Sequence, residues 1–212
     1  MKIGVISDTH GGAQGWRQAV AGPFVGAELI LHAGDIFYHG PRNPLPPGYD
    51  PAALAELINA APAPVIIARG NCDSDVDQLV LDFPIQAPYA LVVIEGLRIM
   101  LNHGDPFGLE DPVPGIAKVA QKYKLDVFVA GHTHIPMLES VGGAVNMQSV
   151  RIWKIPPDLK RVGGSLIMNP GSPALPKSRS GEPQPTVGVI EDGRARVVTL
   201  DGRTLLEAPF QR

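Results

Sequence analysis

The sequence predicts an α/β fold, a two-sheet sandwich of mixed β-sheets flanked by helices, in a single domain spanning residues 1–212. Three observations lead to this prediction. Short apolar runs rich in Ile and Val alternate with helical periodicity through the first two thirds of the chain. Strands joined by Gly- and Pro-rich turns dominate the last third. No internal repeat or interdomain linker interrupts the chain, and 212 residues suffice for one sizeable core.

Near-continuous apolar runs predict strands that are buried on both faces, because helices cover both sides of such a sheet. These runs are Ile3–Ile6, Leu29–Leu31, Val65–Ala68 and Val127–Ala130. Three further strands are expected in the last third, at Ser165–Met168, Thr186–Ile190 and Ala195–Leu200. Asp192-Gly193 indicates a hairpin between the last two of them.

Segments whose apolar residues have the spacing of a helix lie between the predicted strands. Asp50 and Pro51 supply an N-cap and a first-turn proline, and Pro62 ends the helix that they begin. A second helix is expected over 116–123, before the strand that ends at Ala130. Trp16, Val20 and Phe24 have the spacing of a third helix, after the first strand.

Residues 137–164 are expected to form an inserted hairpin that is exposed to solvent. Four cations give the segment a basic character, and Trp153 offers an apolar anchor; the cations are Arg151, Lys154, Lys160 and Arg161. An oligomer contact or a rim beside a substrate site is the alternative. The sequence leaves the oligomeric state open, with a homodimer or homotetramer as candidates.

The bulk composition narrows the function classes. A formal net charge of −3 argues against a nucleic-acid or membrane surface. No stretch approaches the roughly 18 apolar residues of a membrane helix. The N-terminal apolar run is short and ends at Asp8, so no signal peptide is expected. Cys72 is the single cysteine, which suits a reducing compartment, and the protein is expected to be cytoplasmic.

Metal-ligand side chains follow the carboxyl ends of five predicted strands, of which the run Arg98–Leu101, before His103, is the fifth. They are Asp8, His10, Asp35, Asn71, His103, His132 and His134. Open α/β sheets bind their ligands in the crevice at these strand ends. The set is large enough for two divalent ions, and two ions side by side indicate phosphate ester hydrolysis.

The spacing of these residues predicts how they share the ions. In an extended strand residues i and i+2 point the same way, so Asp8 and His10 can converge on one ion, and so can His132 and His134 if the strand continues extended. Asp35 stands alone between two sets of ligands, so it is the residue expected to bridge the two ions. Mixed Asp, His and Asn ligands favour transition metals, with manganese expected first and nickel, iron, cobalt or zinc as alternatives. A hydroxide held between the ions would be the nucleophile.

The motifs together resemble the calcineurin-like metallophosphoesterase superfamily. They are D-x-H at Asp8, G-D at Asp35, G-N at Asn71, H-G at His103 and G-H-T-H at Gly131–His134. Further segments are similar to bacterial YfcE-type phosphodiesterases, namely His39–Leu45, Pro47–Tyr49, Arg69–Gln78 and Phe83–Ile85. The resemblance covers most of residues 1–136 and resumes at Asn169–Ser172. It implies the metallophosphoesterase fold.

The resemblance also implies a ligand assignment. One ion would be held by Asp8, His10, Asp35 and His134. The second would be held by Asp35, Asn71, His103 and His132. Asn71 would in addition contact the phosphoryl group of the substrate.

The chain departs from the wider superfamily after Asn71. Cys72 occupies the position of a histidine that helps the leaving group depart, although YfcE-type sequences also carry cysteine there. A thiol matches this task poorly, because its ordinary pKa is near 8.5. The protein is therefore expected to prefer phosphodiesters with good leaving groups, or to use another donor such as His39. Cys72 as a small buried filler is the alternative.

Two residues on the loop after Asp35 are candidates for substrate binding. His39 and Arg42 should overhang the site, and Arg42 could contact phosphate with two hydrogen bonds. Alternatively, Arg42 pairs with Asp73 or Asp75 and fixes the loop. His32, inside an apolar run, is expected to be structural.

These observations favour a two-metal phosphodiesterase acting on a small phosphate diester. A protein-binding scaffold of the same fold is the first alternative, and the complete ligand set argues against it. A nuclease is the second, and the acidic chain without an evident basic track argues against that. A protein phosphatase fits still less well, given Cys72.

Overall fold

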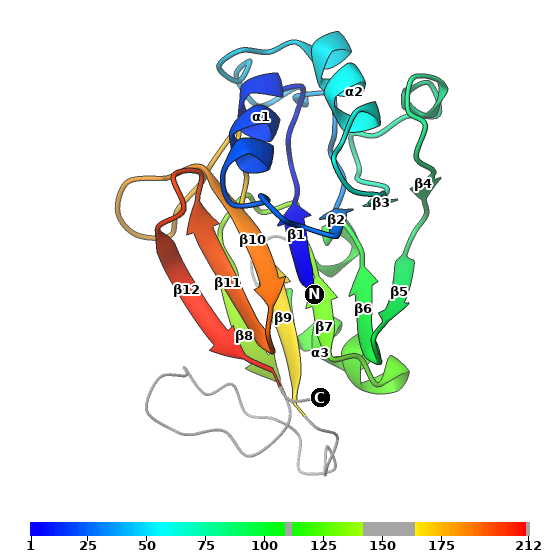
Figure 1. Cartoon of the computed structure of the whole chain (residues 1–212), viewed down its shortest axis with the longest axis vertical. Helices are drawn as coiled ribbons and strands as arrows, with labels where there is room; N and C mark the ends of the chain where they lie inside the picture. The colour runs from blue at the N-terminus through cyan, green and yellow to red at the C-terminus, as the bar shows by residue number, and fades with distance from the viewer. Residues whose placement is uncertain (109–111, 142–163, 211–212) are drawn as a thin grey trace.

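The computed structural model describes residues 1–108, 112–141 and 164–210. Two mixed β-sheets pack face to face, with helices on both outer sides (Figure 1), which confirms the predicted fold class. The predicted strands are all present. No helix of the described residues has the length and apolar composition needed to cross a membrane.

The first sheet has seven strands in the order β12-β11-β10-β1-β2-β3-β4. Its parallel half consists of β1 (Lys2–Ile6), β2 (Leu29–His32), β3 (Val65–Ala68) and β4 (Ile85–Gln86). The antiparallel half consists of β10 (Thr186–Glu191), β11 (Arg194–Thr199) and β12 (Thr204–Pro209). The predicted hairpin at Asp192-Gly193 joins β10 to β11, where both residues have positive φ angles.

The second sheet has five strands in the order β5-β6-β7-β9-β8. They are β5 (Ala90–Ile94), β6 (Leu97–Leu101), β7 (Val127–Val129), β9 (Ser165–Asn169) and β8 (Met137–Val141). β6, β7 and β9 are parallel, whereas the two outer strands are antiparallel to their neighbours. β8 opens the segment expected to be an insertion and pairs with β9. Residues 142–163, with the basic cluster and Trp153, lie outside the described residues.

The helices largely follow the predicted spacing. α2 (Pro51–Asn59) is capped by Asp50, whose carboxylate accepts the backbone N–H of Ala53 at 3.0 Å. α3 (Val113–Tyr123) precedes β7, and two short 3-10 turns are η1 (Asp77–Leu79) and η2 (Asp105–Phe107). α1 (Ala13–Ala21) contains Trp16 and Val20 but ends before Phe24, because Gly22 ends it and a proline follows.

Three apolar clusters define the layers. The inner cluster lies between the sheets and includes Val5, Leu31, Ile99 and Val129. A second cluster packs α1 and α2 against the outer face of the first sheet, and a third packs α3 against the outer face of the second sheet. Alternate side chains of a strand therefore enter different layers. This packing brings the carboxyl ends of β1, β2, β3, β6 and β7 to one edge of the sandwich.

Candidate metal centre

Each predicted ligand except Asn71 and His103 lies in a left-handed turn just beyond its strand. The φ angles of Asp8, His10 and Asp35 are 56°, 45° and 58°, and those of His132 and His134 are 69° and 59°. Non-glycine residues rarely adopt this conformation. The chain thus turns sharply at each strand end, and the expectation that i and i+2 ligands lie along an extended strand is wrong.

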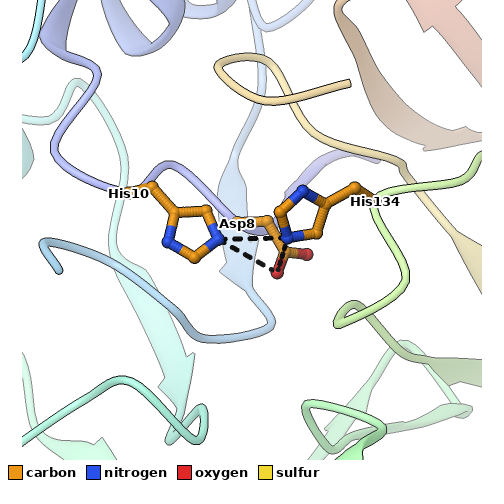
Figure 2. Close-up of side chains that lie close together, drawn as sticks. All are labelled: Asp8, His10 and His134. Atoms are coloured by element: carbon orange, nitrogen blue, oxygen red, sulfur yellow. Dashed lines mark hydrogen bonds and ion pairs between the residues drawn. The ribbon is translucent and has the colours of Figure 1, made fainter. Parts of the chain in front are cut away.

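Asp8, His10 and His134 nevertheless converge (Figure 2). The Nε2 atoms of His10 and His134 are 3.1 Å apart. Oδ1 of Asp8 lies 3.3 Å from Nε2 of His134 and 3.7 Å from Nε2 of His10. All three side chains are buried. Three ligand atoms of the first predicted set therefore surround one point.

A second group consists of Asp8, Asp35 and His103. Oδ2 of Asp35 lies 3.3 Å from Nε2 of His103 and 3.8 Å from Nε2 of His10. One oxygen of Asp35 thus lies between a histidine of the first set and a histidine of the second. Oδ1 of Asp8 is 3.9 Å from Nε2 of His103, so the two groups are adjacent.

The backbone fixes which nitrogen each histidine presents. Nδ1 of His10 is 2.6 Å from the carbonyl oxygen of Tyr38, Nδ1 of His103 is 2.8 Å from that of Ala33, and Nδ1 of His134 is 2.7 Å from that of Leu175. A carbonyl oxygen only accepts, so each Nδ1 carries the hydrogen and donates it. This pattern holds metal-binding histidines in the tautomer whose Nε2 lone pair is available.

The side chains that surround these Nε2 atoms suit a bound cation. In their neutral forms His10 and His134 direct two lone pairs at each other across 3.1 Å, a repulsive arrangement unless a positive charge lies between them. Two nitrogens bound to one ion at about 2.1 Å are about 3.0–3.4 Å apart, for angles at the ion between octahedral and tetrahedral. Oδ1 of Asp8 and Nε2 of His103 are buried without a hydrogen-bond partner among the described residues. Buried polar atoms are normally paired, so these two atoms indicate a ligand.

The electrostatics of the group agree with this conclusion. Burial alone would raise the pKa of Asp8, but the adjacent His134, His103 and His10 lower it. Burial would lower the pKa of His103, yet the carboxylates of Asp35 and Asp8 raise it to about 10. The two carboxylates therefore remain ionised and hold a positive charge on His103 when no metal is bound.

His132 and Asn71 lie beside this group. The ring of His132 packs edge-on against that of His103 at 5.1 Å, and its backbone N–H donates to Oδ2 of Asp8 at 3.0 Å. His132 and His134 thus face different partners, because the chain does not continue as an extended strand here. The exposed side-chain amide of Asn71 donates to Sγ of Cys72 at 3.3 Å.

Cys72 lies at the mouth of the group. Its ligand atom is within 4.8 Å of those of His10 and Asp35. Its backbone N–H donates to Oδ1 of Asp35 at 2.8 Å. Burial and the negative charge of Asp35 raise the pKa of the thiol to about 12, so Cys72 is protonated at neutral pH. It is only half-buried, which disagrees with a fully buried filler.

The loop after Asp35 carries His39 and Arg42. The ring of His39 packs edge-on against Tyr38 and Tyr49 at 5.0 and 5.6 Å, and its Nδ1 is enclosed without a hydrogen-bond partner among the described residues. Arg42 is exposed and forms no ion pair with a described residue. The alternative that it pairs with Asp73 or Asp75 is therefore wrong.

His32 has the structural role expected for it. Nδ1 accepts the backbone N–H of Gly34 at 3.1 Å, so Nε2 donates to Oγ1 of Thr9 at 3.0 Å. Burial lowers the pKa of His32 to about 4, which keeps this fully buried ring neutral.

Two groups of supporting residues were not assigned a role from the sequence. Asp73 accepts backbone N–H groups from Asp35, Ile36 and Gly70. The Asn169–Ser172 turn holds the other side of the site: Asn169 donates to the carbonyl oxygen of Gly131 at 2.7 Å, and Ser172 donates to that of Asp8 at 2.8 Å. Both lie inside segments that carry the family resemblance, which was the available signal.

Comparisons with known proteins agree with this geometry. The family model of the calcineurin-like phosphoesterase superfamily domain matches residues 1–192. Phosphodiesterase YfcE of Escherichia coli K12 is 36% identical over 208 residues, 97% of this chain and 96% of the relative. A probable metallophosphoesterase of Methanothermobacter thermautotrophicus is 28% identical over 208 residues, 97% of this chain and 89% of the relative.

Solved structures give the same result. The structure of YfcE from E. coli, described as a phosphoesterase, matches with a TM-score of 0.76 and 33% identity, covering 100% of both chains. Vps29 from Entamoeba histolytica in complex with Zn²⁺ matches with a TM-score of 0.61 and 18% identity over 100% of both chains, and shares the fold. The chain belongs to the calcineurin-like phosphoesterase superfamily, a family of phosphoric ester hydrolases.

Proposed function

We propose that this protein is a two-metal phosphodiesterase that hydrolyses small phosphate diesters. The observation that carries the proposal is the set of three buried histidines that present Nε2 atoms toward two carboxylates. His10, His103 and His134 each donate Nδ1–H to a backbone carbonyl, which leaves Nε2 for a metal. The similarity to a phosphodiesterase along 97% of the chain supports the reaction class.

The proposed ligands follow from the two adjacent groups. Asp8, His10, Asp35 and His134 would hold the first ion, and Asp35, Asn71, His103 and His132 the second. Support for Asp35 as the shared ligand comes from the position of its Oδ2, 3.8 Å from His10 and 3.3 Å from His103. Histidine, carboxylate and amide donors suit manganese, which we propose as the resident ion, and also nickel, iron, cobalt and zinc.

The side chains around the ligands would divide the remaining tasks. When bound, the ions supply a nucleophilic water at neutral pH and neutralise charge on the phosphoryl oxygens. Asn71, on the exposed rim, would orient the phosphoryl group, and Arg42 on the overhanging loop would bind a phosphate oxygen pair. His39, enclosed by two tyrosines on the same loop, would protonate the leaving group.

The thiol of Cys72 bears on substrate preference. A general acid works best when its pKa is near the operating pH. Burial and Asp35 hold the pKa of Cys72 at about 12, so the thiol donates its proton poorly at neutral pH. The proposed substrates are therefore diesters whose leaving groups need little protonation beyond what His39 would supply.

An ester panel on metal-stripped protein tests the proposal. Each divalent ion is added back separately, and hydrolysis of a bis-aryl phosphodiester is compared with that of an aryl phosphomonoester. We expect metal-dependent hydrolysis of the diester, strongest with Mn²⁺, and little hydrolysis of the monoester. Asp35→Asn should reduce the rate by on the order of 100-fold or more. Asp201→Asn, on an exposed turn, is the matched control and should retain the wild-type rate.

Two outcomes would contradict the proposal. Wild-type activity in Asp35→Asn would rule out a bridging carboxylate. A protein that neither retains metal nor hydrolyses any ester would instead support the scaffold alternative.

A further inference from the structure

We propose that Asp73 is a positioning residue that fixes the bridging carboxylate of Asp35, an inference that rests on the proposed two-metal function. Asp73 carries no ligand role in that function. Its side chain is 5% exposed and is directed at the backbone of the metal-binding turns.

The carboxylate of Asp73 connects the ends of two parallel strands. Its Oδ2 accepts the backbone N–H groups of Asp35 at 2.9 Å and of Gly70 at 2.7 Å. Its Oδ1 accepts the backbone N–H of Ile36 at 2.7 Å. Asp35 and Ile36 follow β2, whereas Gly70 follows β3. One buried side chain therefore links the turns that follow β2 and β3.

The turn that contains Asp73 forms hydrogen bonds with Asp35 at two points. Asp73 holds the backbone nitrogen of Asp35, a residue with a φ angle of 58°. Cys72, the preceding residue, donates its backbone N–H to Oδ1 of Asp35 at 2.8 Å. With its backbone and one oxygen fixed, the other oxygen of Asp35 remains between His10 and His103.

The two turns are in such close contact that a shift of one displaces the other. A Cβ atom on Gly70 would lie 2.2 Å from Oδ1 of Asp35. A Cβ atom on Gly34 would lie 2.4 Å from the backbone nitrogen of Gly70. Glycine is therefore needed on both sides of the contact, and the hydrogen bonds of Asp73 hold it together.

A carboxylate is the side chain that this site requires. Three N–H donors converge on its two oxygens, and an ionised carboxylate is acceptor-only. The asparagine amide has one acceptor oxygen, so either orientation of Asp73→Asn places an NH₂ group against at least one backbone N–H. A buried donor left without an acceptor is costly, and the turn of Asp35 is expected to move.

The test compares Asp73→Asn with Asp75→Asn, a control on the same turn. Both substitutions remove one negative charge, but Asp75 is 92% exposed and pairs with Arg69 at 3.0 Å. Mn²⁺ affinity is measured by calorimetry on metal-free protein. We expect Asp73→Asn to raise the dissociation constant by about 10–100-fold. The Asp75→Asn value should stay within about twofold of wild type, because an exposed ion pair contributes little.

Electron paramagnetic resonance supplies a readout that a general loss of stability would not change. Two Mn²⁺ ions that share a carboxylate are magnetically coupled, and we expect the coupling to change in Asp73→Asn and to persist in Asp75→Asn. A lower melting temperature with wild-type Mn²⁺ affinity and coupling would overturn the inference. If the wild-type protein binds no Mn²⁺ pair, the proposed function fails instead.

Asp73→Glu covers the case in which Asp73→Asn does not fold. Glutamate keeps the charge and both acceptor oxygens but moves them by one methylene group. Weaker Mn²⁺ binding by the folded Asp73→Glu protein supports the positioning role. Wild-type affinity and coupling in that protein would overturn it.

Discussion

At the scale of single residues, the histidines of the site use their two nitrogens for separate tasks. In His10, His103 and His134, Nδ1 anchors the ring to the backbone, and Nε2 points at the carboxylates. The anchor carbonyls belong to Ala33 and Tyr38, which follow β2, and to Leu175, which follows β9. The rings are therefore oriented by the fold before any ion arrives, and binding needs little rearrangement.

His103 should give the proposed metal binding a pH dependence. In the metal-free protein Asp35 and Asp8 raise its pKa to about 10, so the imidazolium is present at pH 8. A histidine binds a metal through a nitrogen lone pair and must be neutral, so binding releases this proton and affinity should rise with pH up to about 10. We expect about one proton to be released from His103 at pH 8, measured by calorimetry in buffers of different ionisation enthalpy.

His103→Asn should abolish the part of the proton release that comes from His103. His32→Asn is the control, because burial lowers the pKa of His32 to about 4 and the ring has no proton to lose at pH 8. Equal proton release by wild type and His103→Asn would contradict the assignment.

The identity of the site residues was predictable from the sequence, whereas their arrangement was not. Asp8, His10 and Asp35 are recognisable because polar residues end apolar strands. Their left-handed φ angles are set by hydrogen bonds between turns, such as that from the Asp8 N–H to the carbonyl oxygen of Gly34 at 2.9 Å. Such long-range contacts leave no local pattern, and they separate His132 from His134.

At the scale of elements, strongly apolar strands and capped helices were predicted, and weakly patterned strands were not. β1, β2, β3 and β7 are apolar runs covered on both faces. β5 alternates buried and exposed positions, and β12 has a single strand neighbour and is largely exposed. Their pairing is decided by the neighbouring strand, β6 or β11, rather than by their own composition.

α2 allows an element-scale prediction. The carboxylate of Asp50 accepts the N–H of Ala53, and its loss in Asp50→Ala should lower the free energy of unfolding by about 1 kcal/mol. For a domain of this size the melting temperature should fall by about 2–4 °C. Thermal unfolding followed by circular dichroism measures the change.

Glu56→Gln, on the exposed part of the same helix, is the control and should melt at the wild-type temperature. Mn²⁺ affinity should be unchanged in both variants, since α2 packs on the outer face of the first sheet. A wild-type melting temperature for Asp50→Ala would show that the cap contributes nothing.

At the scale of the whole molecule, the proposed ligands come from both sheets. Asp8 and Asp35 follow β1 and β2 of the seven-stranded sheet. His103 and His134 follow β6 and β7 of the five-stranded sheet. An ion bound to this group would therefore crosslink the two halves of the sandwich, which are also joined by apolar packing and by hydrogen bonds such as that from His103 to the carbonyl oxygen of Ala33.

Metal removal should consequently lower global stability. At a free Mn²⁺ concentration of 100 times the dissociation constant, binding stabilises the folded state by about 2.7 kcal/mol. We expect addition of a chelator to lower the melting temperature by about 5–10 °C. Asp8→Asn should lose most of this difference, and an identical wild-type melting curve with and without Mn²⁺ would contradict the crosslink.

The close spacing of the Nε2 and carboxylate atoms also limits how the two sheets can align. One residue of a β-strand advances the chain by about 3.3 Å. The distances that join the sheets at the site, 3.3 Å from Asp8 to His134 and 3.3 Å from Asp35 to His103, are no longer than that step. A slip of a single residue between the sheets would separate both of these pairs, so the proposed ion site would add a chemical requirement on strand alignment to that of core packing.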